Sequence, residues 1–120
     1  MDNNTIDSLK EALKFSPDNI PLRLHLAQTL LGLNRIEEAE KEFQHILTIE
    51  HNNEKAKFGL ATVFYQKGEY STCNVILEEL IHSDTTDIGL LVLYTRALLK
   101  ENAISQAIEL YQRVLAIIPD

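Results

Sequence analysis

The sequence predicts an all-α fold, a solenoid of antiparallel helix pairs. Residues of one kind recur every 34 positions, both at a small-residue position and at a turn position that tolerates positive φ. The small residues are Ala39, Cys73 and Ala107, and the turn residues are Asn34, Gly68 and Asn102. Large apolar residues follow the same register at helical spacings. Such a period is typical of a repeat array. It disfavours the alternative that composition alone allows, an ordinary bundle of four to seven helices.

About seven helices are expected, one alone and then three pairs with a tight turn inside each pair. The predicted helices are 5–15, 20–33, 36–49, 54–67, 70–82, 88–101 and 104–117. Residues 1–4 are expected to form a short disordered lead, with Asn4 or Thr5 capping the first helix. The predicted organisation is a capping half-unit, 1–19, followed by full units 20–53, 54–87 and 88–120, which together form one domain.

This order of residues resembles the tetratricopeptide repeat family, whose motif spans 34 residues. The family's leucine–small pair is matched by Leu26-Ala27 and Leu60-Ala61, and its closing proline by Pro17 and Pro119. The family's early tryptophan is missing, because Arg23, Lys57 and Leu91 occupy its position. The resemblance implies a right-handed α-solenoid whose first helices line a concave face that binds a peptide or helix.

The resemblance also places a candidate ligand groove on the first helix of each unit. Its expected core is Leu24, Leu31, Phe58, Tyr65, Val92 and Leu99, and its expected rim is Gln28, Lys55, Thr62 and Arg96. Pro21, His25, Gly59, Gly89 and Leu93 hold the remaining groove positions. An apolar strip with a polar rim is typical of a protein interaction surface. The alternative is that other segments of a longer parent protein cover these residues.

One binding mode of the family is not expected in this chain. Members that bind the acidic tails of heat-shock chaperones hold carboxylates with lysine, asparagine and arginine side chains. The matching positions here are Leu24, Gln28, Gly59, Gly89 and Leu93, four of which lack a polar side chain. The expected partner is therefore another protein or peptide, bound as a helical or extended apolar segment.

No pattern of catalytic residues is found in the sequence. It has no glycine-rich phosphate loop, no His-Glu-x-x-His motif and no cysteine pair. The four histidines, His25, His45, His51 and His82, are never three or four residues apart on one helix. Cys73 holds the small-residue position, so we interpret it as a packing residue. We therefore predict a protein that is not an enzyme and that has no cofactor and no metal site.

Net charge and hydropathy further restrict the classes of partner and the cellular location that are expected. A net charge of −7 disfavours nucleic acid as the partner. The sequence lacks the long apolar run that a membrane span requires, and its start does not have the basic and apolar regions of a secretory signal. A cytoplasmic location is the default expectation.

The last predicted helix carries more apolar residues than its own unit can cover. These candidates for self-association are Ile104, Ile108, Tyr111, Leu115 and Ile118. Because terminal repeats normally present a polar outer face, we expect either a fragment of a longer protein or end-to-end pairing through this helix. A further alternative, by analogy alone, is the N-terminal adaptor region of a larger protein such as an AAA-type ATPase.

Overall fold

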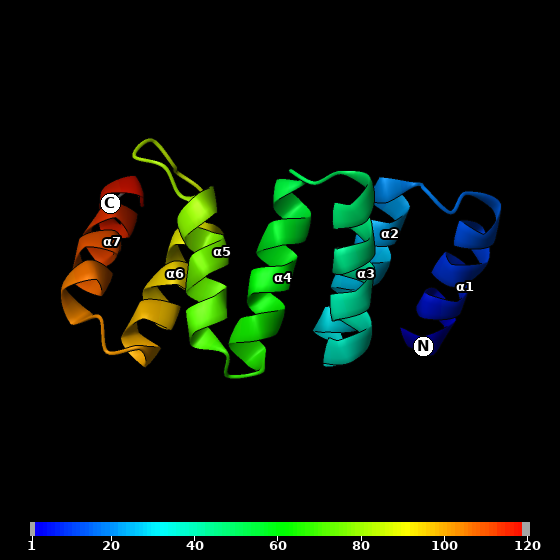
Figure 1. The fold of residues 1–120 in the computed structure, drawn as a ribbon, viewed down its shortest axis with the longest axis horizontal. Helices are drawn as coiled ribbons and strands as arrows, with labels where there is room; N and C mark the ends of the chain where they lie inside the picture. The colour runs from blue at the N-terminus through cyan, green and yellow to red at the C-terminus, as the bar shows by residue number, and fades with distance from the viewer. Residues whose placement is uncertain (1, 119–120) are drawn as a thin grey trace.

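The computed structural model describes residues 2–118, and this range contains seven α-helices (Figure 1). The helices are α1 (Asp2–Phe15), α2 (Ile20–Gly32), α3 (Ile36–Ile49), α4 (Glu54–Gln66), α5 (Tyr70–Leu80), α6 (Ile88–Lys100) and α7 (Ile104–Ile117). Successive helices run antiparallel and pack on one another along the chain, from α1 at one end to α7 at the other. The predicted all-α array of helix pairs is thus confirmed.

The helix boundaries agree closely with those predicted, with one correction at the N-terminus. Helices α2 to α7 all begin at the predicted residue, and their ends fall within two residues of the predicted ones. The disordered lead and the cap at Asn4 or Thr5 are wrong for residues 2–4, because α1 already begins at Asp2. Ile6, near the start of α1, is buried in the first core cluster, and this packing stabilises the beginning of the helix. Met1, Pro119 and Asp120 lie outside the described residues.

Three N-caps with the repeat spacing fix the starts of the first helices, and they were not predicted from the sequence. Asn19, Asn53 and Asp87 lie 34 residues apart, immediately before α2, α4 and α6. Their side-chain oxygens accept the backbone N–H of Leu22 at 3.1 Å, of Ala56 at 2.8 Å and of Leu90 at 3.2 Å. Each bond satisfies a donor that the helix start would otherwise leave without a partner.

The turns inside the pairs have the backbone conformation that the sequence predicts. Asn34, Gly68 and Asn102 have φ values of 64°, 80° and 63°. Asparagine and glycine are the residues that accept this left-handed conformation most readily. A helix therefore ends and reverses direction at each of these three positions.

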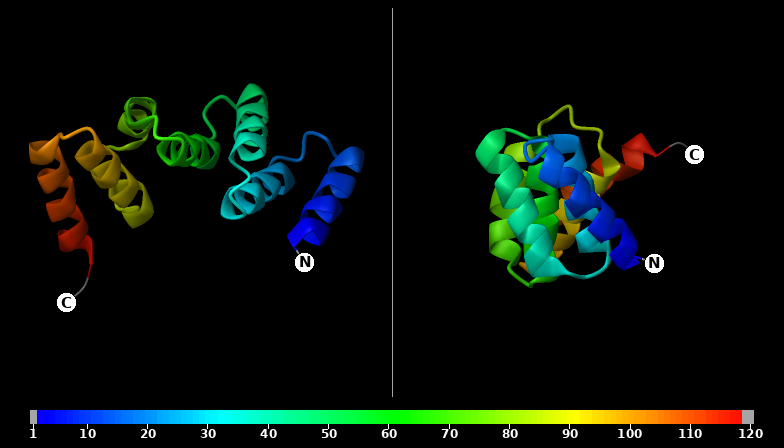
Figure 2. Two further views of the ribbon diagram at one scale, coloured as in Figure 1. Left: turned by 90° about the horizontal axis from the view of Figure 1, so that it is seen from below. Right: turned by 90° about the vertical axis from the view of Figure 1, so that its right-hand side faces the viewer.

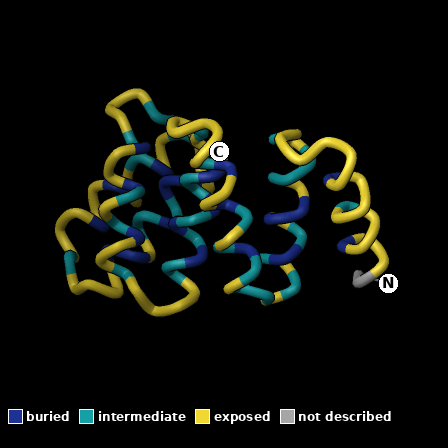
Figure 3. The backbone as a smooth tube through the Cα atoms, turned by 45° about the vertical axis from the view of Figure 1, so that its right-hand side comes forward, coloured by how far each residue is buried: buried dark blue, intermediate teal, exposed yellow. Residues whose placement is uncertain are grey.

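The core lies between the helices, and the turns are exposed (Figure 3). The small residues Ala39, Cys73 and Ala107 are at most 2% exposed, as their predicted role in close helix packing requires. Large apolar residues surround them in three successive clusters along the array. Each helix pair thus shares its core only with its neighbours, as in other repeat proteins.

The array is curved, and the first helices lie on its inner side. Helix α4 contacts both α2 and α6, whereas α3 and α5 make no contact with each other over the described residues. Close approach on one side and separation on the other bend the row into an arc (Figure 2). The inner side of this arc is the surface on which a ligand groove is expected.

Ion pairs occupy the place of the family's tryptophan in the first two units. The Arg23 guanidinium donates to a Glu42 carboxylate oxygen at 2.7 Å and to the Pro17 carbonyl at 2.8 Å. Lys57 lies 4.0 Å from Glu79 in the next unit. Each of these ion pairs connects the first helix of a unit to the second helix of the same unit.

Cys73 is expected to be unreactive in the folded protein. Its side chain is fully buried, and this burial raises the pKa of the thiol from 9.0 to about 11. The stability linked to this shift is present below pH 9 and is lost as the pH rises through about 11, because the folded state holds the proton more tightly. At pH 8 a colorimetric thiol reagent should label native protein at least about 100-fold more slowly than urea-unfolded protein. Equal labelling rates would contradict the buried position.

No helix within residues 2–118 has both the length and the hydrophobicity that crossing a bilayer requires.

Candidate functional site

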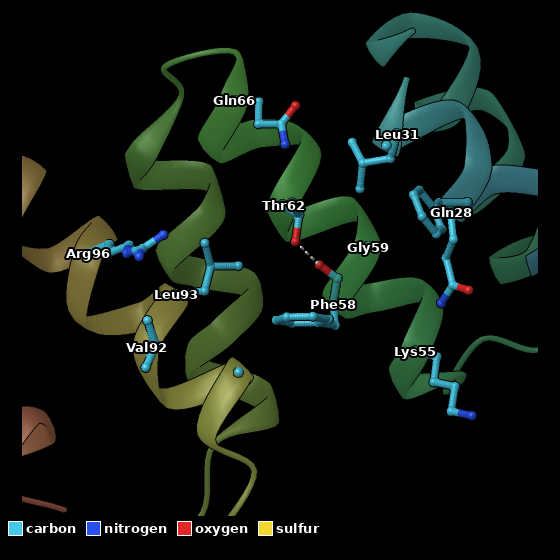
Figure 4. Close-up of a pocket in the computed structure, with 13 residues that line it drawn as sticks. Gln28, Leu31, Lys55, Phe58, Gly59, Thr62, Gln66, Val92, Leu93 and Arg96 are labelled. Atoms are coloured by element: carbon cyan, nitrogen blue, oxygen red, sulfur yellow. Dashed lines mark hydrogen bonds between the residues drawn. The ribbon is translucent and has the colours of Figure 1, made fainter. Parts of the chain in front are cut away.

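The inner side of the arc contains a cavity of about 610 Å³ between α2, α4 and α6 (Figure 4). Its apolar walls include Leu31 from α2, Phe58 from α4, and Val92 and Leu93 from α6. Phe58 points from α4 toward α6, where Val92 and Leu93 lie. The volume is in the range of small-ligand and side-chain pockets, and the mainly apolar lining with a few polar groups is typical of binding sites.

The polar groups of the cavity lie between and beside these apolar side chains. They are Gln28 from α2, Lys55, Thr62 and Gln66 from α4, and Arg96 from α6. The Thr62 hydroxyl donates to the Phe58 carbonyl at 2.9 Å, which leaves its oxygen able to accept from a ligand. Hydrogen-bonding side chains thus come from all three inner helices.

Two further depressions extend the cavity into a continuous groove. One, of about 350 Å³, shares Gln28, Lys55 and Phe58 with the cavity and also includes Glu54 and Asp87. The other, of about 560 Å³, lies toward the opposite ends of the same helices. It shares Leu31, Gly32 and Gln66 with the cavity and adds Asn34, Tyr65, Tyr70 and Lys100. A chain segment can therefore lie along the groove rather than in a single hole.

The two ends of the groove differ in charge. Glu54 and Asp87 line one end together with Lys55, whereas Lys100 is the charged residue that lines the other end and Arg96 lies in the central cavity. The lining of the central cavity contains no acidic residue, although the whole chain has a net charge of −7. The Lys100 ammonium also lies 5.9 Å from the centre of the Tyr70 ring. A bound segment would therefore meet a field that favours a negative group near Lys100.

The structure brings seven of the ten predicted groove residues together around the central cavity. They are Gln28, Leu31, Lys55, Phe58, Thr62, Val92 and Arg96. Leu24 packs instead against the first core cluster, and Tyr65 lies in the basic end of the groove, with its ring edge-on to Tyr70 at 5.3 Å. Leu99 lies away from the groove, in a depression that it shares with Ile108 and Tyr111 of α7.

Ten residues of the groove were not predicted as groove residues from the sequence. Three line the central cavity, namely Gly32, Phe43 and Gln66. The other seven line its two extensions, namely Asn34, Tyr70, Lys100, Glu54, Leu80, Asp87 and Leu90. Gly32, Gln66 and Lys100 are equivalent positions in the 34-residue register. Each lies one helical turn after a predicted rim residue, so helical spacing could have identified them. Phe43 gave no such signal, because it comes from a second helix.

Gly59 allows the ring of Phe43 to reach the groove wall. A Cβ at position 59 would come within 2.7 Å of Phe43 Cδ1, and nearer still to the outer ring atoms. Phe43 itself is fully buried. The absent side chain at Gly59 therefore makes room for a core residue as well as opening the floor of the groove.

A metal site requires a cluster of titratable side chains in a particular arrangement. Across residues 2–118 there is no group of three or more histidine, cysteine, aspartate or glutamate side chains that could hold a metal ion. His25, which was predicted as a groove residue, lines none of the three depressions described above. What the groove can do chemically is hold apolar and charged side chains.

Comparisons with known proteins agree with this class of concave helical array. A family model described as tetratricopeptide repeat matches residues 3–57. The chain is similar in fold to MamA residues 41–end from Desulfovibrio magneticus RS-1, with a TM-score of 0.88, 18% identity and coverage of 98% of this chain and 67% of that one. The MamA RS-1 ArsTM double mutant is similar in fold with a TM-score of 0.87 and 18% identity, over 98% of this chain and 66% of that one.

A third solved structure is YrrB, described as a TPR protein with an unusual peptide-binding site. It has a TM-score of 0.82 and 17% identity, over 93% of this chain and 58% of YrrB. The chain thus spans about two thirds of the length of the MamA structures and less of YrrB. A search of curated proteins gave no match. The predicted resemblance to the tetratricopeptide repeat family is thus confirmed over residues 3–57, and the predicted fold of antiparallel helix pairs is confirmed over nearly the whole chain.

Proposed function

We propose that this protein is a non-enzymatic interaction scaffold that holds a segment of another protein in the groove along α2, α4 and α6. The observation that supports this most directly is the cavity of about 610 Å³, in which Leu31, Phe58 and Val92 remain partly accessible. Nothing within the described residues fills it. The similarity in fold to YrrB, whose description includes a peptide-binding site, is consistent with the proposal.

The lining of the groove indicates the chemistry of the bound segment. A large apolar side chain would fill the cavity and bury apolar surface against Phe58 and Val92. A carboxylate beside this anchor would lie toward Arg96 and Lys100, where the groove is basic. This arrangement differs from the carboxylate clamp for chaperone tails, whose positions are apolar or glycine here except Gln28.

The same groove would serve an adaptor region of a larger protein, such as an AAA-type ATPase, equally well. The proposal concerns the surface and its ligand chemistry, and it holds for either length of parent chain. A partner other than nucleic acid remains the expectation from the net charge of −7.

A selection from a library of random displayed peptides would test the proposal. The wild-type chain should enrich peptides that combine a large apolar residue with a nearby acidic residue. Val92→Glu and Thr62→Glu place a carboxylate inside the apolar cavity, so each should abolish enrichment. Val75→Glu is the matched control, because Val75 is 60% exposed on α5 and lines none of the depressions of the groove.

Circular dichroism should show that all three variants keep the helical content of the wild type. Failure of the wild type to enrich any peptide family would contradict the proposal. So would retention of the same peptides by folded Val92→Glu and Thr62→Glu variants.

A further inference from the structure

An unbroken row of apolar side chains runs along the outer face of α7 and continues to Ile118, the residue immediately after the helix. Within the described chain no other helix covers it, and each side chain in the row is about half exposed. The row consists of Ile104 (46%), Ile108 (51%), Tyr111 (56%), Leu115 (53%) and Ile118 (46%). Their spacing alternates between four and three residues. From Ile104 to Leu115, within the helix, this alternation is the pattern of a helix that packs along its length against another helix.

At two of its five positions the row differs from the corresponding residues of the internal units, whereas the other three positions are apolar in all units. The counterparts of Ile108 in the 34-residue register are Glu40 and Asn74, and those of Ile118 are Glu50 and Asp84. In α3 one of these polar residues connects two units, because the Glu40 carboxylate accepts a hydrogen bond from the Lys67 ammonium of the next helix pair at 3.0 Å. Two isoleucines at these positions cannot form the ion pair that Glu40 forms with the following unit. They favour a more apolar occupant.

The order of residues in the row favours a second copy of the same helix. The row has the same order of residue types on both sides of Tyr111. The first aliphatic residue is Ile108 before it and Leu115 after it, and the second is Ile104 before it and Ile118 after it. A surface that pairs with itself across a two-fold axis must be self-complementary in this way. Antiparallel pairing about Tyr111 would place every apolar residue against another one.

Charge does not oppose such a pairing. Ser105 and Gln112, which border the row on the helix surface, are uncharged. The charged residues of α7, Glu109 and Arg113, lie elsewhere, in a depression beside Glu78 and Ile81 of the preceding pairs. Two α7 helices could therefore approach without bringing like charges together.

The surface also has a hole that suits an inserted side chain. A depression of about 210 Å³ lies between α6 and α7, lined by Thr95, Leu99, Ala107, Ile108 and Tyr111. Together with Leu99, which is 49% exposed, the row offers on the order of 600 Å² of largely apolar surface per chain, close to what each partner of a standard interface contributes. This area suffices for a dimer once rim residues are added.

We propose that two copies of this chain pair through the α7 row, antiparallel, with Tyr111 at the two-fold axis. The pairing uses no residue of the central cavity or of its two extensions, so both grooves stay open. The dimer would present two grooves, and a partner with two binding segments would gain avidity.

Sedimentation velocity over a range of concentrations tests the proposal with the whole chain. The wild type should form a dimer, and Ile108→Glu/Ile118→Glu should weaken self-association at least about 100-fold, because four carboxylates would enter the interface. These substitutions suit the fold, since glutamate holds the equivalent positions of the first unit, as Glu40 in α3 and as Glu50 immediately after it. The control Ile49→Glu/Val75→Glu adds equal charge at exposed positions on α3 and α5 and should leave the dimer intact.

A disulfide trap tests the position of the axis. In a Cys73→Ala background, Tyr111→Cys should form a covalent dimer under mild oxidation, because the two thiols meet at the axis. A wild type that stays monomeric throughout the concentration range would overturn the proposal. So would a dimer that the Ile108→Glu/Ile118→Glu variant retains, or one that the control variant also loses.

Discussion

A Phe43→Ala variant should lose about 3–5 kcal/mol of unfolding free energy. Phe43 is the largest of the fully buried side chains, and it packs in the first core cluster with residues from α2 to α4. Its removal would leave a cavity at the junction of two repeat units and widen the floor of the groove. Urea unfolding followed by circular dichroism would measure the loss. Phe15→Ala is the control, because Phe15 is 84% exposed and should cost less than about 0.5 kcal/mol.

The close approach of Gly59 to the Phe43 ring allows a further test of this packing. Gly59→Ala should cost about 1–3 kcal/mol, because the added methyl group meets the Phe43 ring. Adding Phe43→Leu to the Gly59→Ala variant should recover part of this lost stability. One repeat further along the chain, Leu77 is equivalent to Phe43 and Leu93 to Gly59, and these two leucines share one core cluster. In the matched control Gly32→Ala the new methyl group has open space. A Gly59→Ala variant as stable as the wild type would show that the ring moves aside freely.

Reversing the charge at the basic end of the groove should change which peptides bind. The Arg96→Glu/Lys100→Glu variant should bind a peptide that carries an apolar anchor and an acidic residue at least about 100-fold more weakly than the wild type does. Two attractions become two repulsions, while the apolar cavity keeps Phe58 and Val92. Isothermal titration calorimetry with one peptide from the wild-type selection would measure the difference.

Two controls accompany the measurement on the Arg96→Glu/Lys100→Glu variant. A peptide in which lysine replaces the acidic residue should prefer the variant to the wild type. Raising the salt concentration should reduce both preferences, because exposed charges are screened. If the variant and the wild type bind the acidic peptide equally, the carboxylate does not lie near Arg96 and Lys100.

Much of the fold was predictable because its determinants are local. Asn34, Gly68 and Asn102 end helices through a backbone preference that each residue carries by itself. The small residues of the second helices are buried because any side chain at that position faces a neighbouring helix. The caps at Asn19 and Asn53 were equally local and could have been predicted from the same register.

The groove was predictable only in part. The register gives the angular position of each residue on its own helix, which sufficed for Gln28, Thr62 and Arg96, one from each inner helix. It does not give the rotation between successive units, which decides the neighbours of that residue. Tyr65 therefore lies beside Tyr70 at the basic end, although Leu31, its counterpart, lines the central cavity.

By itself the sequence determined the period of the array, its helices, its turns and the residue types on the inner face. These follow from backbone preferences and from helical spacing within one repeat. Only the tertiary structure decided that Phe43 reaches the groove over Gly59 and that Leu99 faces α7 instead. Both outcomes depend on how closely neighbouring helices approach, and this distance is set by the sizes of side chains that are far apart in the sequence.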